Sequence, residues 1–118
     1  MKKVILSCTT ALILVVSAAV VFAADKSVTV KGEVVDTMCY ASMGAGGEGH
    51  AKCGIGCAKK GVPIGLVDGA KKMYILLPGK DDTPIPPAVV EHMGKMVTVT
   101  GKVYQSGGNS FLTVESVK

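Results

Sequence analysis

The feature that most constrains the fold is a series of short runs in which apolar and polar residues alternate or apolar residues cluster. Five runs have this character, at residues 27–40, 63–67, 72–77, 96–104 and 110–117. Alternation with a period of two is typical of strands that bury one face. Asp68-Gly69 and Gly107-Gly108-Asn109 are suitable hairpin turns between neighbouring runs. Acidic residues and prolines before residues 88–93 favour one short helix there. The sequence therefore predicts an all-β fold with short helices.

An apolar segment precedes these runs. Two lysines follow Met1, residues 4–24 carry no charged side chain, and the segment closes on Val21-Phe22-Ala23. This arrangement is typical of a secretory signal peptide cleaved after Ala23. We expect residues 1–23 to be the signal peptide, which would also remove Cys8, and residues 24–118 to be one periplasmic or secreted domain without stable membrane insertion. The uncharged run is long enough to cross a bilayer, so an uncleaved inner-membrane anchor is the alternative.

The charge of the remaining chain narrows the classes of partner. Residues 24–118 contain 11 Lys, no Arg and 9 acidic residues, which gives a net charge of +2. Without arginine and with few aromatic side chains, the domain is a poor candidate for nucleic-acid binding. A domain of this size is marginally stable and often needs a disulfide or a metal. Three cysteines remain to supply one, Cys39, Cys53 and Cys57.

The last third of the chain carries a resemblance to a known fold. Residues 94–103 followed by residues 110–114 are similar to the helix-to-strand segment and closing hairpin of OB domains. The likeness extends loosely over residues 27–118 and implies a five-stranded, OB-like Greek-key barrel. The chain also resembles small exported bacterial proteins in which an OB-like barrel carries a Cys/His insert. Here the insert is residues 41–61, after the first strand, and it holds 7 of the 15 glycines. We expect function to reside in this insert.

The candidate ligands follow the spacing C-x10-H-x2-C-x3-C, formed by Cys39, His50, Cys53 and Cys57. If residues 50–60 are helical, the last three share one helix face. Cys39 would then complete a tetrahedral site from the end of the first strand. Three sulfurs and an imidazole suit zinc.

Neighbouring side chains bear on the identity and reactivity of such a site. Met38 and Met43 flank Cys39 and add thioethers, which shift the composition toward copper(I). Three lysines of the insert are expected either to favour the thiolate form of the cysteines or simply to form a solvated face: Lys52, Lys59 and Lys60. His92 lies in the last turn of the predicted short helix, where an imidazole suits the carbonyl end.

Two other uses of the cysteines stay open. Exported cysteines generally form disulfides, and Cys39 paired with Cys53 or Cys57 fits disulfide geometry better than an i, i+4 pair within one helix. A thiol oxidoreductase is a lesser alternative because the C-x-x-C spacing is absent. No catalytic constellation or dinucleotide fingerprint occurs, so we do not expect an enzyme. The leading prediction is an exported module that holds zinc or copper for sequestration, delivery or stability. The alternative is a disulfide-stapled barrel that binds an exported protein partner without a metal.

Overall fold

The computed structural model describes residues 26–118, and the predicted signal peptide lies outside the described residues. Within residues 26–118, no helix is long and apolar enough to span a membrane. The strands of this part are β1 (Val28–Asp36), β2 (Ile64–Asp68), β3 (Met73–Pro78), β4 (Met96–Gly101), β5 (Val103–Ser106), β6 (Asn109–Val114) and β7 (Ser116–Val117). The helical segments are α1 (Thr37–Met43), the 3₁₀ turn η1 (Glu48–His50), α2 (Ala51–Lys59) and α3 (Pro87–Glu91).

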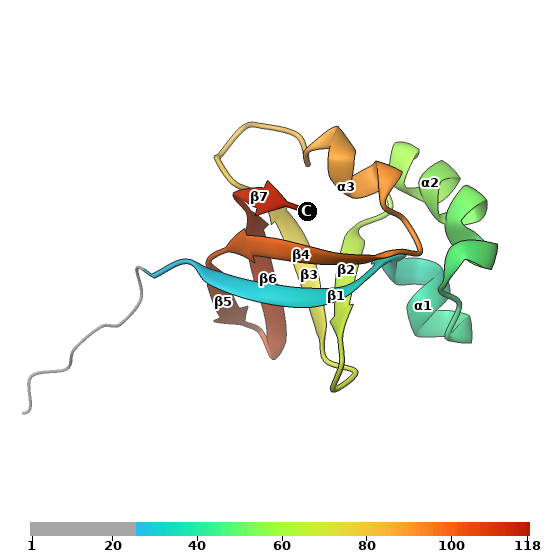
Figure 1. The fold of residues 1–118 in the computed structure, drawn as a ribbon, viewed down its shortest axis with the longest axis horizontal. Helices are drawn as coiled ribbons and strands as arrows, with labels where there is room; N and C mark the ends of the chain where they lie inside the picture. Colours follow the sequence, from blue (N-terminus) through green and yellow to red (C-terminus); the bar gives the residue numbers. More distant parts are fainter. Residues whose placement is uncertain (1–25) are drawn as a thin grey trace, which may run out of the picture.

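The strands form one sheet in the order β5-β6-β3-β2-β1-β4-β7. Every neighbouring pair is antiparallel except β3 and β6, which run parallel. The helices α1 and α2 lie beyond one end of the strands, and α3 lies beside α2 (Figure 1). The prediction of a mostly β fold with short helices is confirmed. The finer prediction of a closed five-stranded OB-like barrel is not, because the sheet has seven strands and ends at β5 and β7.

The two extra strands arise where the predicted C-terminal runs change partner. The run predicted at residues 96–104 divides at Lys102, so that β4 pairs with β1 while β5 pairs with β6. At this division a Cβ on Gly101 would lie 1.6 Å from the Thr113 carbonyl oxygen, so only glycine permits the backbones to approach this closely. Two backbone hydrogen bonds cross the same point, Thr113 N–H to Lys102 O at 3.0 Å and Glu115 N–H to Thr100 O at 2.9 Å.

The core is a layer of aliphatic side chains from alternate strand positions. The alternation in β4 and β6 places Val99 and Leu112 at 0% exposure, as expected for strands with one buried face. Leu66 of β2, a strand buried over four consecutive residues, is also at 0% exposure. From above this layer, α3 contributes Val89, and the turn after it contributes Met93, which is 2% exposed. The predicted helix at residues 88–93 is thus confirmed as α3, and it closes the core on the side that faces α2.

The first strand is shorter than its alternating run suggested. It ends at Asp36, and residues 37–43 form α1 instead of continuing the strand. Asp36 causes the change, since its side chain accepts the Cys39 N–H at 2.8 Å and so caps the new helix. Gly44 ends α1 in the left-handed conformation, at φ 65°.

The loop between α1 and α2 contacts the sheet and the turn before β4 through the backbone of Gly47. The Gly47 N–H donates to a carboxylate oxygen of Glu33 in β1. A Cβ built on Gly94 would lie only 2.3 Å from the Gly47 carbonyl oxygen. Gly94 also has a positive φ of 77°, which favours glycine. Gly94 in turn donates its N–H to Val34 O at 2.8 Å. The insert is therefore held against β1 and the turn before β4.

Substitution of the two glycines of α2 by alanine should change stability in opposite directions. A Cβ on buried Gly54 would lie 2.6 Å from Cγ of Met93, whereas a Cβ on Gly56 would meet nothing within 4 Å. We expect Gly56→Ala to raise the free energy of unfolding by about 1 kcal/mol, because alanine favours helix. We expect Gly54→Ala to lower it by about 1–3 kcal/mol, because Met93 is itself buried and has little room to move. Urea unfolding of the two reduced variants tests the pair, and a stabilised Gly54→Ala would show that α2 does not pack as described.

Candidate metal centre

The predicted ligands come from three neighbouring helical segments, α1, η1 and α2. Cys39 lies in α1, His50 is the residue immediately before α2, and Cys53 and Cys57 lie within α2. The condition that residues 50–60 be helical is met by α2 over residues 51–59, and His50 ends the 3₁₀ turn that leads into it. Positions 53 and 57 of α2 lie on one helix face. Cys39 faces them from the other helix because β1 ends directly before it and the loop at residues 44–47 reverses the chain.

The structure brings the four predicted side chains together in two overlapping groups. The ligand atoms of Cys39, His50 and Cys53 all lie within 4.8 Å of one another. A second group with the same separation contains Asp36, Cys39 and Cys57. Cys39 is common to both. The structure therefore brings Cys39, His50 and Cys53 within metal-binding distance of one another and places Cys57 in a second group with Cys39 and Asp36.

That acidic residue, Asp36, joins the elements of the cluster. It is fully buried, and its Oδ1 accepts the Cys39 N–H while its Oδ2 lies 2.8 Å from Nε2 of His50. One side chain thus sets the start of α1, where Cys39 lies, and the orientation of the imidazole before α2. The sequence signal was present as Asp36-Thr37-Met38-Cys39, the spacing of a helix N-cap, but the extended alternating run concealed it.

The charge on Asp36 determines which ring nitrogen of His50 is the hydrogen-bond donor in the pair. Burial alone raises the pKa of this carboxyl, but the Cys39 N–H and the His50 ring outweigh burial and lower the pKa below its ordinary value of 3.8. The ionised carboxylate can only accept hydrogen bonds, so the His50 Nε2 carries the proton in the pair. In a neutral imidazole this leaves Nδ1 with a free lone pair for an ion.

The same buried charge raises the pKa values of two of the thiols. Burial, followed by the hydrogen bond and charge of Asp36, raises the pKa of Cys39 to about 12. Burial first, and then the charge of Asp36 and the neighbouring Cys53, raises the pKa of Cys57. The idea that Lys52, Lys59 and Lys60 promote thiolates does not hold for these two cysteines. The three lysines are exposed to water, whereas Asp36 is buried beside the sulfurs.

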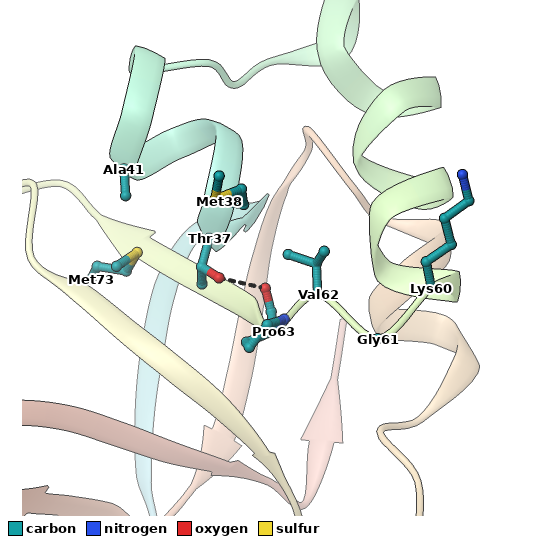
Figure 2. A pocket seen from close by; sticks show the side chains of 8 residues that line it. All are labelled: Thr37, Met38, Ala41, Lys60, Gly61, Val62, Pro63 and Met73. Carbon is teal, nitrogen blue, oxygen red and sulfur yellow. Dashed lines mark hydrogen bonds between the residues drawn. The ribbon is translucent and has the colours of Figure 1, made fainter.

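The methionines and the second histidine lie elsewhere. Met38 lines an open groove of about 580 Å³ between α1, the α2–β2 connection and Met73 of β3, and no residue of the two ligand groups lines this groove (Figure 2). Thr37 fixes one wall of the groove through its Oγ1, which donates to Pro63 O at 2.9 Å. Met43 is 70% exposed. His92 donates from Nδ1 to Ala88 O at 2.6 Å, which is the helix-end role predicted for it.

Comparison of the chain with protein-family models, with curated proteins and with solved structures found no match. The geometry of the centre is that of short helical segments that converge on a buried aspartate.

Substitution of Asp36 tests this geometry in the reduced, metal-free chain. Asp36→Ala removes acceptors from the Cys39 N–H and from His50, and we expect it to lower the free energy of unfolding by about 2–4 kcal/mol. Asp36→Asn keeps one acceptor oxygen for the helix cap, so we expect a smaller loss. Urea unfolding at neutral pH measures both. Exposed Asp81→Asn is the matched control, and we expect it to change stability by less than about 0.5 kcal/mol.

The dependence of the free energy of unfolding on acidic pH gives a second test of the role of Asp36. Because the folded state lowers its pKa, the stabilising contribution of Asp36 is complete above the ordinary aspartate value of 3.8 and is lost as the pH falls through the lower folded value. We therefore expect the stability difference between the native chain and Asp36→Asn to shrink below about pH 4. A difference that stays constant from pH 7 to pH 2 would contradict the assignment of an ionised, hydrogen-bonded Asp36.

Proposed function

We propose that the chain is an exported module that binds one zinc or copper(I) ion through Cys39, His50, Cys53 and Cys57. The observation that carries the proposal is the approach of Cys39, His50 and Cys53 within 4.8 Å of one another, although they come from separate helical segments. Cys57 is close to Cys39 in the second group and to Cys53 through their thiol contact, so it is the natural fourth ligand.

The residue behind the imidazole favours zinc over copper(I). Metal-binding histidines typically donate their second ring nitrogen to a carboxylate, which orients the ring and makes it a better donor. The pair of His50 Nε2 and Asp36 Oδ2 at 2.8 Å has this form. The thioether of Met38, which suggested copper(I), lines the groove beside α1 together with Met73 and not with the ligand groups. Three cysteines and one histidine also form a common zinc ligand set.

The position of the cluster suits retention and exchange of an ion, and not catalysis. Four protein ligands close a tetrahedral zinc site, whereas catalytic sites keep one position open. Cys53 is exposed, so an ion can reach the cluster from solvent. The insert contains glycine-rich loops and short helices that bury little apolar surface. An ion that joins α1 to α2 would therefore stabilise the insert, and the chain would serve to sequester, deliver or simply be stabilised by the metal.

The carrier of this insert is, in our proposal, an OB-like barrel exported by a cleaved signal peptide at residues 1–23. The pairing of β1 with β2 and β4, the parallel pair of β3 and β6, and the hydrogen bonds between residues 100–102 and 113–115 support an OB-like path of the chain. Location in the periplasm or outside the cell rests on the sequence of the leader alone.

The second candidate function is a protein-interaction module whose cysteines form a disulfide. Its specific support is that Cys39 and Cys53 belong to different helices and their sulfurs already lie within 4.8 Å. The groove lined by Met38 and Met73 would then be a place for an exported protein partner. In this case the insert needs no metal, because the covalent link would join α1 to α2.

Mass measurement under native conditions separates the two functions. We expect the anaerobically purified, reduced chain to bind one zinc ion, and we expect Cys39→Ala or the double variant His50→Ala, Cys53→Ala to lose that stoichiometric binding. His92→Ala is the matched control and should bind zinc as the native chain does, because His92 bonds to its own helix. Titration with copper(I) in parallel determines the preferred ion.

The pH dependence of binding has a definite sign. Cys39 and Cys57 are protonated in the metal-free chain at neutral pH, since their pKa values are raised, and an ion must displace those protons. We therefore expect the zinc affinity to fall as the pH is lowered. A chain that is two hydrogen masses lighter than its sequence and binds no ion would contradict the metal function and support the disulfide-linked module.

A further inference from the structure

The three thiols of the cluster differ in their access to solvent. Cys53 is exposed, whereas Cys39 and Cys57 are partly buried. A reagent that approaches the cluster from solvent therefore meets Cys53 first. Thiol–disulfide exchange depends on such access to the attacking sulfur.

The helix surface around Cys53 lacks side chains that would shield it. Gly56 lies three residues further along α2, on the same helix face as Cys53, and Gly49 precedes the helix. A Cβ built on either glycine would meet nothing within 4 Å, so both open onto free space. Glycine at position 56 lowers the helix propensity of α2, and no neighbouring atom requires a small residue there. At position 54, by contrast, contact with Met93 requires a small residue.

The charged side chains of α2 are all basic, and Lys52 adjoins Cys53 in the sequence. Lys52, Lys59 and Lys60 are all exposed on or directly after α2. No described acidic side chain is part of α2 itself. Such a surface favours the approach of a small anionic reagent over a neutral one.

A second thiol is in place to complete an exchange. The sulfurs of Cys39 and Cys53 lie within 4.8 Å of each other and belong to different helices. A disulfide between two elements can reach relaxed geometry by a small movement. The thiols of Cys53 and Cys57 are in contact, but the helix keeps Cβ atoms at i, i+4 about 5–6 Å apart, which is too far for a relaxed disulfide. Cys39 is therefore the thiol placed to resolve a mixed disulfide on Cys53.

We propose that Cys53 is the entry point for thiol–disulfide exchange with a small anionic disulfide such as glutathione disulfide, and that the exchange releases the bound ion. This inference rests on the proposed function. The Cys53 thiolate attacks one sulfur of the reagent, which forms a mixed disulfide and expels one glutathione thiolate. The Cys39 thiolate then attacks the Cys53 sulfur and expels the second. The two protein thiolates are oxidised by two electrons, the reagent disulfide is reduced to two thiolates, and the ion leaves because two of its sulfur ligands are gone.

The full chain, reduced, loaded with zinc and kept free of oxygen, tests the inference. We expect added glutathione disulfide to release one zinc ion per chain, measured with a chromogenic chelator, and to yield a Cys39–Cys53 link in non-reducing peptide maps. Maps of early samples should show glutathione on Cys53. Glutathione found first on Cys39 or Cys57, or a final link that omits Cys53, would overturn the inference.

Two variants that leave the ligands in place make the test specific. Gly56→Leu should bind zinc as before but release it several-fold more slowly, because a side chain then covers the open face beside Cys53. Lys52→Glu should slow the reaction with glutathione disulfide and leave the rate with neutral hydroxyethyl disulfide unchanged. Unaltered release from Gly56→Leu would contradict the assigned entry point.

The failures of the two proposals are distinguishable. A reduced chain that binds no zinc contradicts the proposed function, and the release with it. A chain that binds zinc but keeps it in the presence of glutathione disulfide contradicts only the present inference.

Discussion

The interaction on which the centre depends is the double hydrogen bond of one buried carboxylate. Asp36 accepts the Cys39 N–H through Oδ1 and lies 2.8 Å from the His50 Nε2 through Oδ2. It therefore ends a strand, starts a helix and orients an imidazole at the same time. Burial of a charge is costly unless the charge is paired and hydrogen-bonded, and here both oxygens have partners. The lowered pKa of Asp36 expresses that compensation.

The sheet supports this arrangement by close backbone contacts. Gly54 lets α2 approach the buried Met93, and the Gly47 backbone fits against Gly94 and Glu33. A larger residue at Gly54 or Gly94 would push the insert away from β1, to which Asp36 belongs. The insert is thus attached to the fold through small residues and backbone hydrogen bonds instead of a large apolar interface. Such attachment leaves its outer face, with Cys53, open to solvent.

Prediction from the sequence succeeded where local pattern and tertiary structure agree. The strands of the core, the turn at residues 107–108 and the helix α3 were all expected from periodicity and turn residues. It failed where a local signal competed with a stronger one. The alternating run continued past Asp36, so α1 was read as strand, and the run at residues 96–104 gave no sign that it would change partner at Lys102.

By itself, the sequence determined which residues carry the chemistry, because soft ligands are rare in this chain and four of them fall within 20 residues. It also determined the mostly β architecture, since alternation with a period of two specifies a buried face. Only the tertiary structure decided that Cys39 meets His50 and Cys53, that Asp36 joins them, and that burial and Asp36 raise the pKa values of Cys39 and Cys57. The physical reason is that proximity across two helices and the burial of a charge depend on how distant segments pack, which local spacing does not encode.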